Sequence, residues 1–156
     1  MRPERAKAGS ADGALALEHF LPYRLSVLSN TVSGRIAKSY ADRFQLTIPE
    51  WRVMAVLGRF PGLTAGEVTE RTAMDKVQVS RAVARLKKTQ RIEQRAVEGD
   101  RRARHLFLTH AGERVYAQIV PLARDYERRF TASLTPNERL QLDRLFDKLA
   151  AAAGEL

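Results

Sequence analysis

Apolar residues recur at intervals of three and four positions along much of this chain, which is the spacing of one face of an α-helix. The first such stripe runs from Ala14 to about Phe44. Its apolar members are Leu21, Leu25, Leu28, Val32 and Ile36. Because Pro22 lies within the stripe, we expect one long helix that either begins near Leu21 or is kinked there.

Four later segments start with a polar residue that is followed three positions later by Glu or Gln, a pattern typical of helix amino termini. The four pairs are Thr47 with Glu50, Thr64 with Glu67, Asp75 with Gln78, and Thr135 with Glu138. Pro49 and Pro136 strengthen two of these starts, since proline is favoured in the first helical turn. With Thr109 as the cap of one further helix, the predicted helices are Pro49–Phe60, Ala65–Arg71, Lys76–Gln90, His110–Phe130 and Pro136–Ala152.

Two short segments, Ile92–Val97 and Arg104–Leu108, have the composition of β-strands. The turn expected between them contains the glycine- and arginine-rich run "EGDRR", residues 98–102. The predicted order is therefore four helices, two strands and two helices. This order indicates a mainly α fold with a small β-hairpin.

Length and composition are consistent with one domain, since a chain of 156 residues that is 44% hydrophobic can bury one core. The absence of cysteine excludes disulfides, thiolate metal ligands and cysteine nucleophiles. No apolar run approaches the roughly 18 residues of a membrane span, so no membrane partner is expected. Residues 1–14 are basic but lack the apolar core of a secretory signal, so we expect a disordered tail on a cytoplasmic protein.

Positive charge is concentrated in one part of the chain. The net charge is +9, and the segment from Arg71 to Arg104 holds eleven basic side chains against four acidic ones. Such a field attracts polyanions, which include nucleic acid, an anionic membrane surface or an acidic partner. A surface that serves only solubility intersperses both signs of charge, so this concentration favours nucleic acid over a merely solvated face.

The predicted helix Lys76–Gln90 has two different faces. At 100° per residue, one face gathers Val79, Ala82, Val83 and Leu86, and the other gathers Gln78, Arg81, Arg85 and Lys88. Gln and Arg side chains can bind phosphates and can also form paired hydrogen bonds to adenine or guanine edges in the major groove. The alternative is an ordinary solvated helix face.

The order of these elements resembles the winged helix-turn-helix of the MarR family of bacterial transcriptional regulators. The resemblance is carried by the segments "TAGEVTERT", "AMD", "KVQVSRAVARLKKTQ", "RIEQR", "EGDRR" and "ARHLFLTHAG". It covers about Phe20 to Leu149 and is most specific from Thr64 to Gly112. It implies a mainly α fold with a two- or three-stranded β-wing, in which residues 47–109 form the DNA-binding lobe and residues 15–46 and 110–153 form dimerisation helices.

The resemblance also implies how a homodimer would bind a palindromic operator in double-stranded DNA. Helix Lys76–Gln90 would enter the major groove, and the hairpin Ile92–Leu108 would reach the flanking minor groove. Contacts to base edges or to nearby phosphates are expected from Gln78, Ser80 and Arg81, with Val77 against a thymine methyl group. The residues expected to contact the DNA backbone are Arg85, Lys87, Lys88, Arg101 and Arg104. Arg102 matches the wing-tip arginine of the family, with Asp100 holding it through an ion pair.

The apolar stripes favour dimerisation independently of the resemblance. The first and last helices carry more apolar surface than helices on the rim of a small winged domain could bury. In the last helix these residues are Leu142, Leu145, Phe146 and Leu149. The helix His110–Phe130 is long enough to link the two regions, although Pro121 is expected to kink it.

The stretch His19–Arg59 looks like a subgroup of MarR regulators that control aromatic acid catabolism. This implies a small-molecule effector, either an aromatic acid or its CoA thioester, and no other cofactor. The residues predicted to bind it are His19, Tyr23, Arg24, Ser26, Asn30, Trp51 and Arg52. Core packing is the alternative for Tyr23 and Trp51, and a salt bridge is the alternative for Arg24 and Arg52.

Other functions are less consistent with the sequence. No metal site is expected, since His19, His105 and His110 lack close His or Cys partners. No phosphate loop or nucleophile motif predicts an enzyme. The sequence therefore predicts a DNA-binding transcriptional regulator, most simply a repressor. The alternatives are an architectural DNA-binding protein without sequence specificity, an RNA-binding protein, or an adaptor for an acidic partner.

Overall fold

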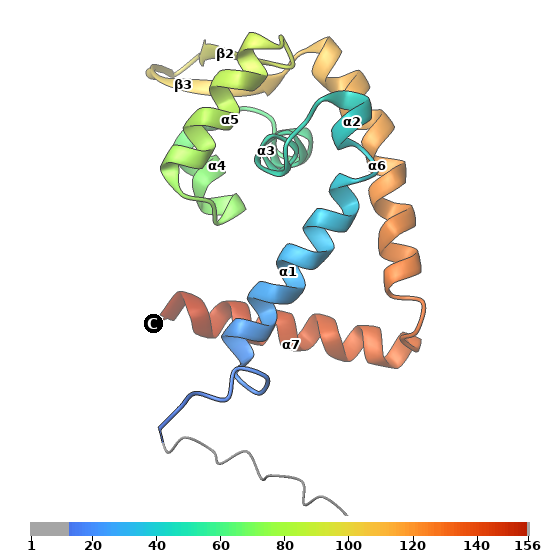
Figure 1. The fold of residues 1–156 in the computed structure, drawn as a ribbon. Helices are drawn as coiled ribbons and strands as arrows, with labels where there is room; N and C mark the ends of the chain where they lie inside the picture. The colour runs from blue at the N-terminus through green and yellow to red at the C-terminus, as the bar shows by residue number, and fades with distance from the viewer. Residues whose placement is uncertain (1–12, 156) are drawn as a thin grey trace, which may run out of the picture. The chain divides into compact units, whose positions relative to one another are not determined.

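The computed structural model describes residues 13–155, except for the side chains of Arg101 and Glu155. The elements in chain order are α1 (Leu21–Ala37), α2 (Ala41–Phe44), α3 (Ile48–Arg59), β1 (Leu63–Thr64), α4 (Ala65–Thr72), α5 (Lys76–Lys88), β2 (Ile92–Val97), β3 (Asp100–Leu108), α6 (His110–Phe130) and α7 (Pro136–Glu155), as Figure 1 shows. They confirm a mainly α fold with a small antiparallel sheet. Nearly all of the predicted tail 1–14 lies outside the described residues.

The chain divides into two compact units, Met1–Arg35 and Ile36–Leu156. The described part of the first unit holds most of α1, whose residues from Leu21 to Thr31 are all exposed. The second unit holds the remaining elements. No helix within residues 13–155 combines the length and the apolar character that crossing a membrane requires.

The long first helix predicted up to Phe44 is wrong at its carboxyl end, where the structure has two helices. It begins at Leu21, as one of the two expected alternatives, and α1 ends at Ala37. The N–H groups of Ser39 and Tyr40 bond to carbonyls three residues back, at 2.9 and 3.1 Å, which tightens and ends the helix. Tyr40 is only 1% exposed, and this burial raises its pKa to about 12. Helix α1 therefore ends just before Tyr40, whose ring packs in the core.

The predicted caps are confirmed as hydrogen bonds. The hydroxyls of Thr47, Thr64 and Thr135 each accept from the backbone N–H three residues on, and the backbone N–H of each threonine donates to the carboxylate of the Glu at that position. Asp75 accepts from the N–H of Gln78 at 2.8 Å and begins α5, but this pair lacks the reciprocal bond that the three threonine pairs form. Thr109 caps α6 through the N–H of Gly112 at 3.0 Å. Helix α6 then continues through Pro121 to Phe130.

The sheet has the order β1–β3–β2, and both strand pairs are antiparallel. The predicted start of the second hairpin strand at Arg104 is wrong, because β3 begins at Asp100. Val97 pairs with Asp100, so only Glu98 and Gly99 form the turn, where Gly99 adopts a φ of +90°. The strand β1 was absent from the predicted order of elements, and it pairs Leu63 with Leu106. The wing arginines therefore lie on a strand and not on the turn.

Helix α3 lies at the centre of the second unit. Figure 1 shows it end-on among α4, α5, β3 and α6, with all of which it makes contact. Fully buried residues from these elements form the core, namely Val53, Met54, Leu57, Val68, Val79, Leu86, Leu106 and Ile119. The inward face predicted for α5 is confirmed, since Val79, Ala82 and Leu86 are at most 4% exposed.

The start of α6 packs tightly on the backbone of Arg91. The carbonyl of Arg91 accepts from the N–H of Thr109 at 3.0 Å, and a Cβ placed on Gly112 would lie 1.9 Å from the same carbonyl oxygen. We therefore expect Gly112→Ala to lower the free energy of unfolding by about 1–3 kcal/mol or more, since backbone must move to admit the methyl group. Chemical denaturation measures this difference.

Gly154→Ala is the matched control for that prediction. No atom lies within 4 Å of a Cβ at Gly154, which is in the last turn of α7. Alanine there should leave stability unchanged or raise it by up to about 1 kcal/mol, through helix propensity alone. Equal melting of Gly112→Ala and the wild type would show that the contact at Arg91 is not tight.

Candidate nucleic-acid interface

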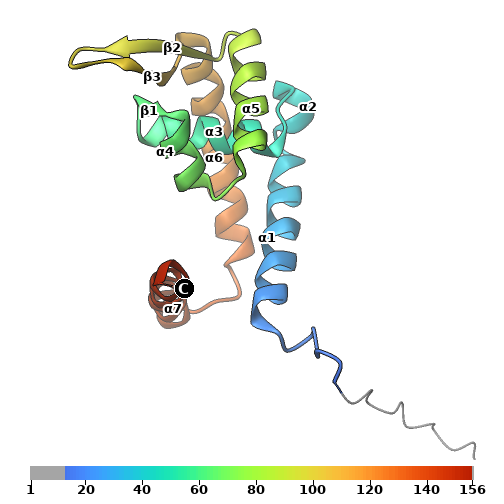
Figure 2. The ribbon, with the colours of Figure 1, turned by 90° about the vertical axis from the view of Figure 1, so that its left-hand side faces the viewer.

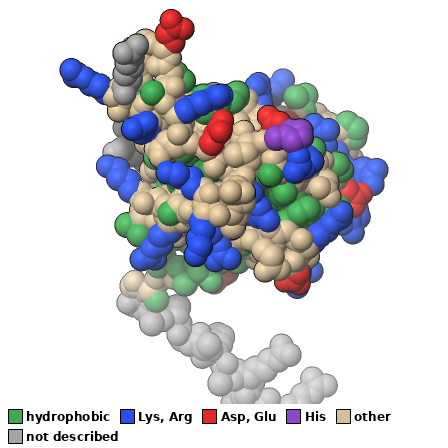
Figure 3. Space-filling view, turned by 90° about the horizontal axis from the view of Figure 1, so that it is seen from above, with side chains coloured by type: hydrophobic (Ala, Val, Ile, Leu, Met, Phe, Trp, Pro, Cys, Tyr) green, Lys and Arg blue, Asp and Glu red, His purple; other side chains and the backbone are tan. Residues whose placement is uncertain are grey.

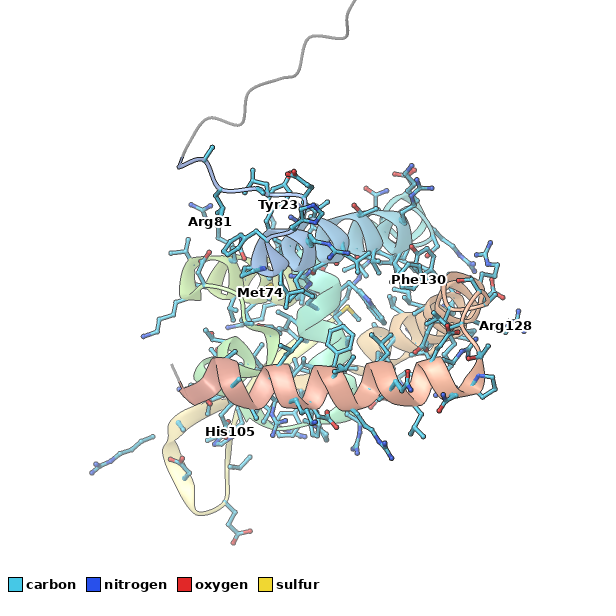
Figure 4. The ribbon with its side chains drawn as sticks, turned by 90° about the horizontal axis from the view of Figure 1, so that it is seen from below. Tyr23, Met74, Arg81, His105, Arg128 and Phe130 are labelled. Carbon is cyan, nitrogen blue, oxygen red and sulfur yellow. The ribbon has the colours of Figure 1, made fainter. Side chains whose placement is uncertain are left out.

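The outward face of α5 carries the polar residues that the sequence placed there. Gln78, Arg81, Arg85 and Lys88 are all exposed, and so is Ser80. Arg81 extends outward from α5 in Figure 4, and Val77, at 57% exposure, adds an apolar contact at the first turn. Because the opposite face is buried in the core, the direction of this polar face is set by packing. It can approach a polyanion without unfolding any part of the lobe.

The hairpin β2–β3 is joined to α5 by side-chain contacts. The Nζ of Lys87 donates to the Oε1 of Gln94 on β2 at 2.9 Å. On the same hairpin, the guanidinium of Arg95 lies 4.0 Å from the ring centroid of Phe107. Figure 2 shows the hairpin projecting from the lobe beside α5. The two predicted contact elements are therefore held together.

A groove runs between α4, α5 and β2. Its lining residues are Ala65, Gly66, Thr69, Lys76, Val79, Ser80, Val83, Ala84, Lys87 and Gln94. Two lysines, three uncharged polar side chains and several small residues allow an anionic chain to approach closely. In the view from above in Figure 3, blue Lys and Arg side chains are spread over the visible face with few red carboxylates among them. The arrangement suits contact with a phosphodiester backbone.

Arg85 has a protein partner that the sequence did not reveal. Its Nε lies 3.0 Å from the Oε1 of Glu50 on α3, and the two side chains are 58% and 4% exposed respectively. Glu50 was predicted only as the capping residue of α3. The helical spacing of Arg85 placed it on the outward face of α5 but carried no information about a partner on another helix.

Arg91 is a further residue that sequence reasoning missed. It follows α5, and its Nη2 donates to the carbonyl of Phe44, while its Nη1 is buried without a hydrogen-bond partner. Burial lowers the pKa of Arg91, and the nearby charge of Glu50 opposes that shift. A single arginine before a strand gives no local signal of this role. Arg91 therefore counts as structural and not as part of the exposed cationic surface.

The wing differs from the prediction at Asp100. Asp100 forms no ion pair with Arg102 within the described part of the chain, and its Oδ2 lies 3.8 Å from the Nε2 of His105 instead. Its other oxygen accepts from the N–H of Ala103 at 3.0 Å, so the carboxylate turns back over its own strand. Arg102 and Arg104 are exposed, and the side chain of Arg101 lies outside the described residues.

His105 anchors the base of the hairpin, where Figure 4 labels it. Its Nδ1 lies 2.8 Å from the carbonyl oxygen of Gly62, next to β1. The described residues contain no group of three His, Asp or Glu side chains that could hold a metal ion.

The predicted effector residues fall in both units. His19, Tyr23, Arg24, Ser26 and Asn30 are exposed in the first unit, with Tyr23 labelled in Figure 4. The other two, Trp51 and Arg52, lie on α3.

The Trp51 ring is partly buried between two aromatic rings of the second unit. Its centroid lies 5.7 Å from that of Tyr40 and 6.0 Å from that of Tyr116. This supports the core-packing alternative for Trp51. Arg52 is half-buried, and its charge partly offsets the raised pKa of Tyr40.

Comparison with known proteins points to one family. Residues 44–103 match the model of the MarR family. The Escherichia coli transcriptional regulator HosA is 26% identical over 94 residues, which make up 60% of this chain and 70% of HosA.

Two solved structures share the fold. A MarR/EmrR family transcriptional regulator from Acinetobacter sp. ADP1 has a TM-score of 0.84 at 22% identity, over 91% of this chain and 100% of that one. BpsR of Bordetella bronchiseptica, whose DNA binding is regulated by 6-hydroxynicotinic acid, has a TM-score of 0.75 at 22% identity, over 88% of this chain and 98% of its own. Residues 44–103 thus resemble the MarR family, and the two solved structures show that the chain shares their fold.

The exposed position of Arg102 leads to a prediction about stability. Since its side chain is exposed and Asp100 is paired elsewhere, Arg102→Ala should change the free energy of unfolding by less than about 0.5 kcal/mol. Denaturation of the two proteins in parallel measures this. A larger loss would indicate that Arg102 has a partner in the folded wing.

Proposed function

We propose that this chain is a MarR-family transcriptional repressor that binds a palindromic DNA operator as a homodimer. The observation that carries the proposal is α5, whose apolar face is buried in the core and whose opposite face presents Gln78, Arg81 and Lys88 to solvent. The shared fold with the Acinetobacter regulator supports it. An α-helix with such a face fits the width of the major groove.

Two kinds of contact are proposed within this interface. Gln78, Ser80 and Arg81, in the first half of α5, would meet base edges, and Val77 would meet a thymine methyl group. Backbone contacts would come from the remaining cations of α5 and the wing, which are Arg85, Lys87, Lys88, Arg101, Arg102 and Arg104. The backbone contacts would supply most of the affinity, and the base contacts would supply the specificity.

Exposed apolar residues support the dimer. On α7, five large hydrophobic side chains are between 39% and 56% exposed, namely Leu140, Leu142, Leu145, Phe146 and Leu149. On α1, Leu21, Leu25 and Leu28 are between 37% and 48% exposed. Apolar stripes of this length on a folded protein are typical of association surfaces. The regions proposed to associate are residues 15–46 and 110–153, outside the DNA-binding lobe at 47–109.

The effector is proposed to be a small aromatic acid or its CoA thioester that releases the DNA. Support comes from BpsR, which shares the fold and responds to 6-hydroxynicotinic acid. The exposed groups on and before α1 include the aromatic and cationic side chains of Tyr23, Arg24 and His19, which suit an aromatic anion. Such a ligand would release DNA only to the extent that it binds the DNA-free form more tightly.

The function is tested by selecting duplexes from a random pool with the wild-type chain. We expect a palindrome with half-sites about 10 base pairs apart, bound about 10³-fold more tightly than random DNA at physiological salt. Gln78→Ala should relax the preference at one position of each half-site. Lys88→Ala should weaken binding to all sequences and reduce the slope of log K against log salt by about one.

Three results would argue against the regulator. Uniform affinity for random duplexes would indicate an architectural protein, and preference for RNA would indicate an RNA-binding protein. A single unpaired site would contradict the two-fold arrangement of the dimer. Analytical ultracentrifugation of the same preparation reports the oligomeric state independently of DNA.

The effector class is tested by thermal shift with 6-hydroxynicotinate, simple aromatic acids and their CoA thioesters. A ligand that binds the native protein should raise the melting temperature with increasing concentration. The same ligand should lower the affinity for the selected duplex. If none of these compounds alters melting or DNA affinity, the proposed effector class is wrong, whereas the DNA-binding proposal stands.

A further inference from the structure

The carboxylate of Glu50 lies in an unusual place for a charge. Among the residues that the structure describes, Glu50 is the one charged residue in the buried core, at 3% exposure. Burying a carboxylate is unfavourable unless its oxygens are paired and hydrogen-bonded. The position of Glu50 therefore calls for partners that offset this loss of hydration.

Helix capping does not require the burial. Glu67 and Glu138 close the same reciprocal capping arrangement on α4 and α7, and both are exposed. Glu50 uses only one oxygen for this purpose, since its Oε2 accepts from the N–H of Thr47 at 3.2 Å. Its second oxygen is directed elsewhere.

That second oxygen, Oε1, lies 3.0 Å from the Nε of Arg85, so the pair links α3 to α5. Only the inner edge of the guanidinium is engaged, since Nη1 and Nη2 have no partner among the described residues and the side chain is 58% exposed. Arg85 shares its face of α5 with Gln78, Arg81 and Lys88. The free edge of the guanidinium therefore belongs to the surface proposed to meet DNA.

We infer that Glu50 is a positioning residue for DNA binding: its buried carboxylate holds Arg85 by Nε and presents the two terminal nitrogens to a DNA phosphate. The inference rests on the proposed function and names a residue outside the contact surface itself. Two parallel N–H donors match a phosphate, and a side chain fixed in advance loses less conformational entropy on binding. Loss of the ion pair between Glu50 and Arg85 should therefore weaken DNA binding even though every cation of the surface remains.

Glu50→Gln is the sharpest test, because glutamine can still close the capping arrangement of α3 while the charge is lost. The probes are the duplex selected by the wild-type chain and a random duplex of the same length. We expect Glu50→Gln to weaken binding by about fivefold to tenfold with an unchanged salt slope, since Arg85 keeps its charge. Arg85→Ala should weaken binding by about tenfold or more and reduce the slope by about one. In the double variant, Glu50→Gln should add nothing further.

Glu67→Gln is the matched control. It removes the same charge from the same lobe, preserves the capping arrangement of α4, and has no arginine within ion-pair distance among the described residues. Its affinity for either duplex should stay within about twofold of the wild type, since an exposed charge is largely screened by salt. Thermal melting of all variants shows that each is folded at the assay temperature.

The inference is overturned if Glu50→Gln binds as tightly as the wild type or more tightly, or if its effect persists undiminished when Arg85 is alanine. If Glu50→Gln does not fold, Arg85→Lys is the test instead. We expect the Arg85→Lys variant to bind DNA more weakly than the wild type with an unchanged salt slope. Wild-type affinity of Arg85→Lys would overturn the inference. A wild-type chain without sequence preference would contradict the proposed function alone. The affinities of Glu50→Gln and the wild type could then still be compared on the random duplex, because phosphate contacts do not depend on sequence.

Discussion

The packing of α5 against α3 is the interaction on which the rest of the proposed DNA-binding lobe depends. Val79 and Leu86 are at most 1% exposed in this contact, and α3 also contacts α4, β3 and α6. The two faces of α5 point in opposite directions, so fixing the apolar face against the core also fixes the direction of Gln78 and Arg81. Packing of the core therefore determines which side chains of α5 face solvent.

Electrostatics and base contacts have different roles on that surface. The segment Arg71–Arg104 carries a net charge of +7 out of the +9 of the whole chain, which attracts any polyanion. Charge alone does not distinguish one DNA sequence from another. The contacts from Lys87 to Gln94 and from Glu50 to Arg85 hold cations of α5 in defined places. In the proposed interface, specificity would then depend on the uncharged and bidentate donors at the start of α5.

Local signals in the sequence predicted much of the fold. Each capping pair, such as Thr47 with Glu50, is complete within four residues, so the helix starts could be recognised without tertiary information. The two faces of α5 followed from helical periodicity for the same reason. The arginines of the wing concealed the true start of β3 at Asp100, because they interrupt the apolar alternation that marks a strand.

The remaining features depend on residues far apart in the chain. The break after α1 accompanies the burial of Tyr40, and β1 is recognisable only through its pairing with β3. The pairing of Glu50 with Arg85 likewise requires α3 and α5 to be packed, although its capping role is local. The neighbour of Asp100 is an exception, because it is set within β3, which places His105 and not Arg102 beside the carboxylate. For Trp51, two aromatic neighbours from other elements favour packing over ligand binding.

Insertion of α5 into the major groove is tested most directly by methylation interference on the selected duplex. Methylation at guanine N7 blocks a major-groove edge and leaves the phosphates unchanged. We expect interference at guanines in two half-sites about one helical turn apart, on the same face of the duplex. Binding that is insensitive to N7 methylation, or interference at one isolated stretch, would contradict recognition by a pair of α5 helices.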